Sequence, residues 1–130
     1  MKPAIVLIVE DDAEQLGFLT RLFSKQNYLV RAVGSALDAI PILKSRHVDL
    51  VVTDLCMPGL NGADLCQMIK NEFHIPVVLI TGSRDVDPQK LVEYCDSILL
   101  KPFPPARLLR ICNGILKGVP CSLLSFTTWM

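Results

Sequence analysis

Acidic, hydroxyl and amino side chains stand at or just after the ends of four short apolar runs in this sequence. The runs are residues 4–9, 48–52, 77–80 and 98–100. The polar residues that follow them are Glu10, Asp11, Asp12, Asp54, Thr81 and Lys101. If the runs are parallel strands of one sheet, these groups meet at its carboxyl edge, where ligands and substrates bind in such sheets.

Carboxylates gathered at such an edge repel one another. Two unit charges about 4 Å apart repel by roughly 1 kcal/mol in water and by several times more near a protein surface. Glu10, Asp11 and Asp54 therefore predict a cation between them. Carboxylate oxygens with room for water suit Mg²⁺, with Mn²⁺ as the alternative. The competing interpretation is that such acids only cap helices or lie in solvated loops, which is what we expect of Asp12.

Asp54 differs from the other acids because a turn-rich segment follows it. Residues 55–62 contain one proline and two glycines. Such a segment leaves the strand sharply and exposes the carboxylate at the rim of the sheet. A carboxylate there can attack phosphorus and form an acyl phosphate. Mg²⁺, the Lys101 ammonium and the Thr81 hydroxyl are the groups that could stabilise charge on the phosphoryl oxygens.

The elements that must position these side chains alternate between strands and helices. Five apolar runs, the four above and residues 28–33, predict strands, and the continuous Val- and Ile-rich ones are typical of strands buried on both faces. Ser35 marks a helix start, Pro41 is expected to kink or split that helix, and Asp87-Pro88 predicts a short fourth helix. Five strand–helix repeats favour an α/β fold, a parallel sheet with helices on both faces.

Composition limits the alternatives. The 130 residues suit one domain, and 51% hydrophobic against 20% charged residues favours a packed core. A formal net charge of zero at pH 7 gives no support to direct nucleic-acid binding.

The five cysteines form no CxxC pair, so neither a disulfide framework nor a zinc site is expected, and a reducing, cytoplasmic setting is the natural interpretation. The apolar runs at both ends are too short to span a membrane. His47 and His74 are expected to be ordinary surface residues.

Four motifs together resemble the receiver domains of bacterial two-component systems. They are residues 8–12 (IVEDD), 53–62 (TDLCMPGLNG), 81–82 (TG) and 101–103 (KPF). Each is weak alone, but all four stand in this order at matching strand ends, and the resemblance covers about residues 4–117. It implies a flavodoxin-like (βα)5 three-layer sandwich, with a five-stranded parallel sheet of order 2-1-3-4-5. It also implies a receiver domain over residues 1–118, followed by a C-terminal tail, 119–130, of unknown role.

The resemblance implies a metal site and a phosphoacceptor. Asp54 matches the phosphoacceptor and contributes to the metal site. Asp11 matches the direct Mg²⁺ ligand, and Glu10 matches the acid that usually reaches the metal through water. The backbone carbonyl of Cys56 matches the third protein ligand, with its side chain facing solvent.

The resemblance also implies two switch residues. Thr81 matches the hydroxyl that turns toward the phosphoryl group, and Lys101 matches the lysine that pairs with the phosphoaspartate. The bond from Lys101 to Pro102 is expected to be cis.

The function implied is that of a phosphoacceptor signalling domain that catalyses only its own phosphorylation and dephosphorylation. The donor would be a phosphohistidine on a sensor histidine kinase or a phosphotransfer protein. The output partner or effector domain cannot be identified from the residues, and a homodimer is left open. Neither direct contact with nucleic acid nor membrane contact is expected.

Departures from the family pattern leave an alternative open. Ile98 stands where the family usually has an aromatic residue that moves inward on activation, and Gly82 follows Thr81 where alanine is common. The segment from Thr81 to Lys101 is also slightly short. The alternative is a phosphorylation-independent interaction module with the same fold. An FMN site is disfavoured because the acids after the first strand would repel a phosphate. An aspartate phosphohydrolase would carry a second acid where Cys56 stands.

Overall fold

One sheet of five parallel strands runs through the computed structural model, which describes residues 2–57, 59, 62–82, 89, 93 and 95–119. The strands are β1 (Ile5–Val9), β2 (Leu29–Val33), β3 (Leu50–Asp54), β4 (Val77–Thr81) and β5 (Ser97–Leu100). Their order is β2-β1-β3-β4-β5, as predicted. β2 therefore lies on one side of β1, and the later strands lie on the other side. Sheets of this kind bind ligands at the point where the strand order reverses in this way, here between β1 and β3.

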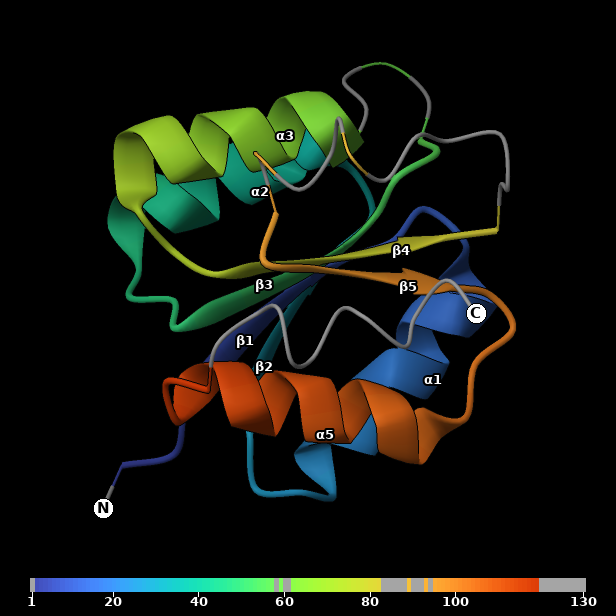
Figure 1. The fold of residues 1–130 in the computed structure, drawn as a ribbon. Coiled ribbons are helices and arrows are strands. Elements are labelled where there is room, and N and C mark those ends of the chain that lie inside the picture. The colour runs from blue at the N-terminus through green and yellow to red at the C-terminus, as the bar shows by residue number, and fades with distance from the viewer. Residues whose placement is uncertain are drawn as a thin grey trace.

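Helices cover both faces of the sheet (Figure 1). One face carries α2 (Ala36–Ser45) and α3 (Gly62–Met68), the latter continued by a π-helical turn, η1 (Ile69–Phe73). The other face carries α1 (Ala13–Ser24) and α5 (Pro105–Leu116). The fourth helix expected from Asp87-Pro88 lies outside the described residues. Among the residues that are described, no helix is both long and apolar enough to cross a membrane.

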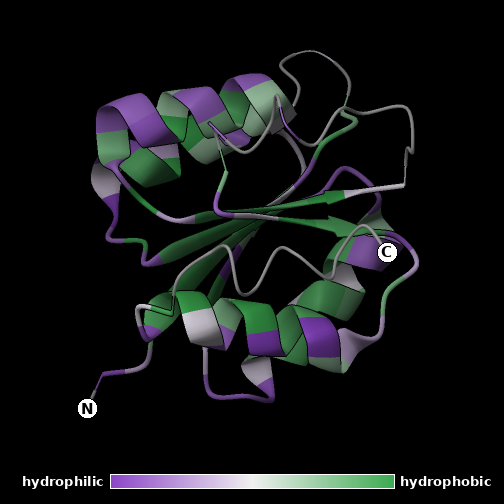
Figure 2. Cartoon of the chain, viewed as in Figure 1, coloured by the Kyte–Doolittle hydropathy of each residue, from purple (hydrophilic) through white to green (hydrophobic). Residues whose placement is uncertain are grey.

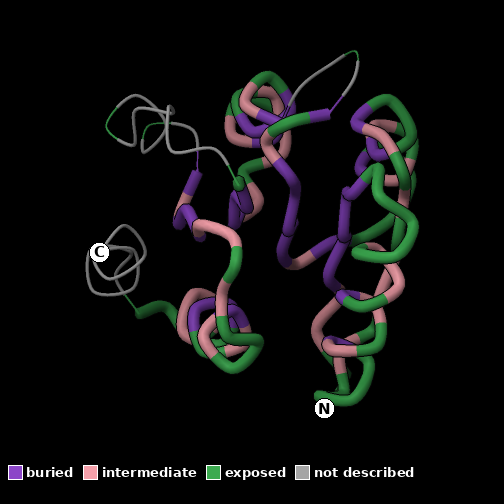
Figure 3. Tube along the Cα trace, turned by 90° about the vertical axis from the view of Figure 1, so that its right-hand side faces the viewer, coloured by how far each residue is buried: buried purple, intermediate pink, exposed green. Residues whose placement is uncertain are grey.

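The strands β1, β3, β4 and β5 bury both of their faces because their side chains alternate between two apolar clusters, whereas the edge strand β2 is only partly buried. The cluster under α2 and α3 takes Leu7, Val9, Val51, Val77, Leu79 and Ile98 from the sheet. The cluster under α1 and α5 takes Val6, Ile8, Leu50, Val52, Val78, Ile80 and Leu99. Figure 2 shows the strands as the most hydrophobic part of the chain, and Figure 3 shows burial concentrated along them. A slip of one residue would exchange the two faces, so the packing fixes the register and brings the strand ends together.

Two helix starts follow the prediction, and Pro41 does not split its helix. Asp12 Oδ1 accepts hydrogen bonds from the backbone N–H groups of Glu14 and Gln15, so this acid is the N-cap of α1. Ser35 caps α2 in the same way. Of the kink or split expected at Pro41, the split does not occur, because α2 runs from Ala36 to Ser45 with Pro41 inside it. The carbonyl that loses its partner belongs to Leu37, which is 65% exposed, so water can hydrate it.

Candidate functional site

Three carboxylates gather at the carboxyl edge of the sheet. Glu10 directly follows β1, Asp11 comes next, and Asp54 is the last residue of the neighbouring strand β3. One oxygen from each lies within 4.8 Å of the others. Glu10 and Asp54 are buried, so the expectation that the following segment exposes the Asp54 carboxylate is wrong: the start of α3 packs directly against the Asp54 backbone. Asp11 is exposed, so the cluster opens to solvent on one side. Oxygen ligands in this arrangement fit a hard divalent cation that keeps some of its water.

Burial and mutual repulsion disfavour the charged forms of the two buried acids. Desolvation raises the pKa of Asp54, and the charge of Asp11 adds to this, while Lys101 acts in the opposite direction. Desolvation also raises the pKa of Glu10, helped by the charge of Asp54 and opposed by the Asp12 backbone N–H, which donates to Oε1 at 3.2 Å. A cation at this edge would offset both effects.

Lys101 brings positive charge to the cluster from the far side of β4. It directly follows β5, and its Nζ lies 3.3 Å from Oδ1 of Asp54 and 3.4 Å from Oε2 of Glu10. Its bond to Pro102 is cis, as predicted. Three carboxylates and one ammonium leave two net negative charges among these four groups, which a divalent cation would balance.

Thr81 and Cys56 lie at the same edge of the sheet as the acids. Thr81 is buried at the end of β4, and its carbonyl accepts a hydrogen bond from the Lys101 backbone N–H at 2.7 Å. The register pairs Asp54 with Ile80, so Thr81 is one residue further along the adjacent strand. Cys56 lies two residues beyond Asp54 with its side chain exposed, as expected. The structure therefore places the predicted hydroxyl and the predicted loop residue at the same edge as the acids.

Residues outside the site also follow the sequence analysis. His47 and His74 are exposed surface residues. The described cysteines other than Cys56 are buried: Cys66, Cys95 and Cys112. These histidines and cysteines are therefore surface and core residues, respectively.

Gly62 is a site residue that sequence reasoning treated only as part of a turn. It begins α3 directly against the backbone of Asp54, and its N–H donates to the Leu55 carbonyl at 2.9 Å. A Cβ at this position would lie 2.3 Å from the Asp54 carbonyl oxygen and 2.8 Å from the Leu55 Cα. Only glycine fits this approach, so Gly62 holds the end of β3 and the backbone of Asp54 in place.

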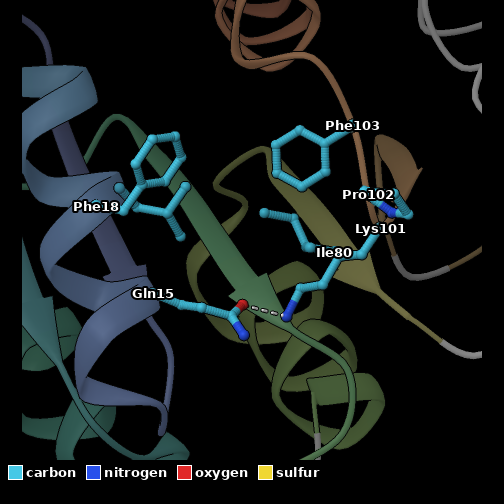
Figure 4. A pocket seen from close by; sticks show the side chains of 7 residues that line it. Gln15, Phe18, Ile80, Lys101, Pro102 and Phe103 are labelled. Atoms are coloured by element: carbon cyan, nitrogen blue, oxygen red, sulfur yellow. Dashed lines mark hydrogen bonds between the residues drawn. The ribbon is translucent and has the colours of Figure 1, made fainter.

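Gln15 is a second residue that sequence reasoning missed. Its Oε1 accepts a hydrogen bond from Lys101 Nζ at 2.7 Å (Figure 4). The signal that could have found it is its spacing. Gln15 stands four residues after Asp11, in the first turn of the helix that leaves the carboxylate edge.

Ile98 lies in the core and not at the rim. It is 1% exposed and packs in the cluster under α2 and α3, with Leu79 as its partner on β4. The position that is usually aromatic in receiver domains is thus filled here by a packed aliphatic side chain.

Comparison with known families agrees with this geometry. The family model described as the response regulator receiver domain matches residues 6–113. The chain belongs to this family. The matched receiver domain includes every residue of the carboxylate cluster as well as Thr81 and Lys101.

Two curated relatives of this receiver domain are named as regulators, one as DNA-binding and one as transcriptional. The DNA-binding response regulator MtrA of Mycolicibacterium paratuberculosis is 31% identical over 92% of this chain and 56% of its own length. The transcriptional regulatory protein YvrH of Bacillus subtilis is 33% identical over 90% of this chain and 51% of its own length. The chain therefore spans about half the length of the curated relatives it matches.

A solved structure supports the same assignment. The signal receiver domain of an HD domain-containing protein from Pseudomonas fluorescens Pf-5 has a TM-score of 0.82 and 26% sequence identity. The match covers 90% of this chain and 97% of that one. The fold is thus that of a receiver domain along most of the chain.

Proposed function

We propose that this receiver domain accepts a phosphoryl group on Asp54 in a reaction that depends on Mg²⁺, and that it changes conformation in response. The observation that carries the proposal is the convergence of Glu10, Asp11 and Asp54 within 4.8 Å, with the Lys101 ammonium 3.3 Å from Asp54. A nucleophilic carboxylate, a set of oxygen ligands and a fixed cation are the components that phosphoryl transfer to aspartate needs.

The residues that would hold the metal are Glu10, Asp11, Asp54 and the backbone carbonyl of Cys56. When bound, Mg²⁺, or Mn²⁺ in its place, neutralises charge on the transferring phosphoryl oxygens. The fit rests on chemistry: the three side chains offer only oxygen, two of them are buried, and the single Lys101 ammonium balances only one of their three charges.

In the proposed transfer, an oxygen of the Asp54 carboxylate forms a bond to phosphorus while the phosphorus–nitrogen bond of the donor phosphohistidine breaks. The imidazole nitrogen leaves with the electron pair of that bond. The Lys101 ammonium and the Thr81 hydroxyl provide positive charge and a hydrogen-bond donor for the phosphoryl oxygens. Attack by water on the phosphoaspartate would later release phosphate, so the domain catalyses only its own phosphorylation and dephosphorylation.

The proposed response begins at the same two residues. Lys101 and Thr81 move toward the new negative charge. Thr81 is the last residue of β4 and Lys101 directly follows β5, so the ends of both strands move with them. That is a local electrostatic change that biases a two-state element. We place the receiver domain at residues 1–118 and assign no role to the tail, 119–130.

The proposed partners follow from the family. A sensor histidine kinase or a phosphotransfer protein would supply the phosphohistidine. An output partner or effector domain would bind the surface that changes near the ends of β4 and β5. The names of the relatives point to control of transcription as the process such an effector could serve, although the receiver itself is not expected to touch nucleic acid. A homodimer formed through the same surface is a further proposed state.

Beryllofluoride, a mimic of the aspartyl phosphoryl group, tests the proposal without a kinase. Added with Mg²⁺ to the protein, it should shift backbone amide resonances near Asp54, Thr81 and Lys101. Asp54→Asn should show none of these shifts, and Asp64→Asn, an exposed acid on α3, should show all of them. A spectrum that does not change on addition would favour the phosphorylation-independent interaction module instead.

A further inference from the structure

Among the residues that the structure describes, the shortest side-chain contact of the Lys101 ammonium is with a residue that the proposed function does not use. Nζ donates to Oε1 of Gln15 at 2.7 Å, whereas the nearest oxygens of Asp54 and Glu10 lie at 3.3 Å and 3.4 Å (Figure 4). The first distance is typical of a charge-assisted hydrogen bond, and the other two are long for one. The ammonium therefore rests on the α1 side of the cluster, against a neutral amide.

Apolar side chains surround this contact. Phe18 from α1, Ile80 from β4 and Phe103 from the segment after β5 line a cavity of about 250 Å³ together with Gln15 and Lys101. Figure 4 shows the amide and the ammonium facing each other below the two rings. Gln15 and Phe18 are themselves exposed, so solvent also reaches the contact, and its preference rests on its short distance.

We propose that Gln15 is a positioning residue of the phosphoacceptor site: its amide oxygen holds the Lys101 ammonium back from close pairing with Asp54. The carboxylate thereby stays available to a divalent cation and to the phosphoryl donor, and the lysine moves only when the phosphoryl group adds charge. This inference rests on the proposed function, because it assigns Gln15 a role in the same reaction.

Removing the amide changes what Lys101 pairs with. Without Gln15, the ammonium keeps the Asp54 and Glu10 oxygens as acceptors, and attraction between opposite charges draws it toward them. It then competes with the divalent cation for the same oxygens. The metal affinity of the site should fall, although Gln15 itself is no metal ligand.

Calorimetric titration of the full chain with Mg²⁺ alone tests this inference. Gln15→Leu should weaken Mg²⁺ binding about two- to tenfold, the range that the net contribution of one hydrogen bond allows. Gln15→Glu keeps an acceptor and should bind Mg²⁺ at least as tightly as the unsubstituted protein. Gln26→Leu, the same replacement at an exposed position just beyond α1, should bind Mg²⁺ normally. Gln15→Ala serves as a second variant if the leucine disturbs folding, which thermal unfolding would reveal.

A second background separates positioning from a merely structural role. With Lys101→Met in place, Gln15→Leu should no longer change Mg²⁺ affinity, because the competing ammonium is gone. Equal Mg²⁺ affinity of Gln15→Leu and the unsubstituted protein would overturn the inference, and so would a loss that persists beside Lys101→Met. Either result leaves the proposed function standing if the unsubstituted protein binds Mg²⁺ and accepts phosphoryl. Failure of the unsubstituted protein to bind Mg²⁺ would overturn the proposed function and this inference together.

Discussion

The Lys101 ammonium lies 3.3 Å from Oδ1 of Asp54, although the two residues stand at the ends of strands that are not neighbours. β4 runs between β3 and β5, so the long lysine side chain crosses the end of β4 to reach the acid. A change of charge on Asp54 therefore acts directly on the backbone that follows β5. We propose that this relationship is the physical basis for coupling between Asp54 and the rest of the fold.

Lys101→Ala should separate phosphorylation from the conformational response. Asp54 keeps its metal ligands and its nucleophilic oxygen, so the variant should still accept a phosphoryl group. It lacks the ammonium that pairs with the phosphoaspartate, so amide resonances of β5 and α5 should hardly move when beryllofluoride and Mg²⁺ are added. Lys117→Ala, beyond the end of α5, is the matched control and should respond normally. A full response by Lys101→Ala would contradict the coupling.

Mg²⁺ should raise the thermal unfolding midpoint of the protein. The cation binds only the folded state, in which the three acids converge, and a ligand at about one hundred times its Kd adds about 2.7 kcal/mol to the free energy of unfolding. Asp11→Asn and Asp54→Asn should lose most of this increase. Glu72→Gln, which changes an exposed acid in η1, should keep it. Differential scanning calorimetry with and without Mg²⁺ measures the effect, and equal midpoints for the unsubstituted protein would count against the metal site.

Without metal, the free energy of unfolding should fall as the pH rises above the ordinary carboxyl pKa. Burial raises the pKa of both Glu10 and Asp54. The folded protein therefore binds more protons than the unfolded chain between the ordinary carboxyl pKa and the raised one, and its relative stability decreases across that interval. Asp54→Asn removes one such group and should be more stable than the unsubstituted protein near neutral pH.

Urea unfolding at a series of pH values, with a chelator present, checks this pH dependence. The slope of the free energy of unfolding against pH should be shallower for Asp54→Asn than for the unsubstituted protein. Identical slopes would mean that Asp54 ionises as easily in the folded protein as in the unfolded chain.

Gly62→Ala should destabilise the protein by about 1–3 kcal/mol, the usual cost of inserting atoms into a closely packed site. The added Cβ would lie 2.3 Å from the Asp54 carbonyl oxygen, so α3 or the end of β3 must shift. Mg²⁺ affinity should fall as well, because Asp54 is displaced. Gly17→Ala is the control: its Cβ meets only the end of the Arg21 side chain, at 3.3 Å, and alanine in a helix is favoured over glycine. Chemical denaturation of both variants measures the difference, and a Gly62→Ala protein as stable as Gly17→Ala would refute the close approach.

Much of the fold could be predicted because burial on both faces leaves a continuous apolar pattern. The runs that predicted β1, β3 and β4 are rich in Val and Ile and are almost fully buried. Their boundaries shifted by a residue or two, since strand ends depend on pairing with neighbours. The π-helical turn after α3 was not predicted, because Leu65 and Ile69 have ordinary helical spacing and both are buried. The turn ends at His74, whose backbone is in the left-handed region. The residue type alone gives little indication of that conformation.

Some residues of the candidate site could be predicted from the sequence, and others could not. The acids, Thr81 and Lys101 could be placed because the topology puts strand ends together, whatever the details of packing. The roles of Gln15 and Gly62 depend on contacts across elements, with Lys101 far along the chain and with the Asp54 backbone. Spacing places Gln15 on the first turn beside the acids, but it does not reveal the contact with Lys101 or the approach of Gly62 to the Asp54 backbone, so both roles became visible only in three dimensions.

The most direct test of the account is to find where a phosphoryl group goes. The protein would be incubated with Mg²⁺ and phosphoramidate, a small donor with a phosphorus–nitrogen bond, and then analysed by intact mass and by mapping of borohydride-trapped peptides. The account predicts a single added phosphoryl group, located on Asp54, absent when Mg²⁺ is chelated and absent in Asp54→Asn. Phosphorylation of another residue, or an equal gain in mass by Asp54→Asn, would contradict it.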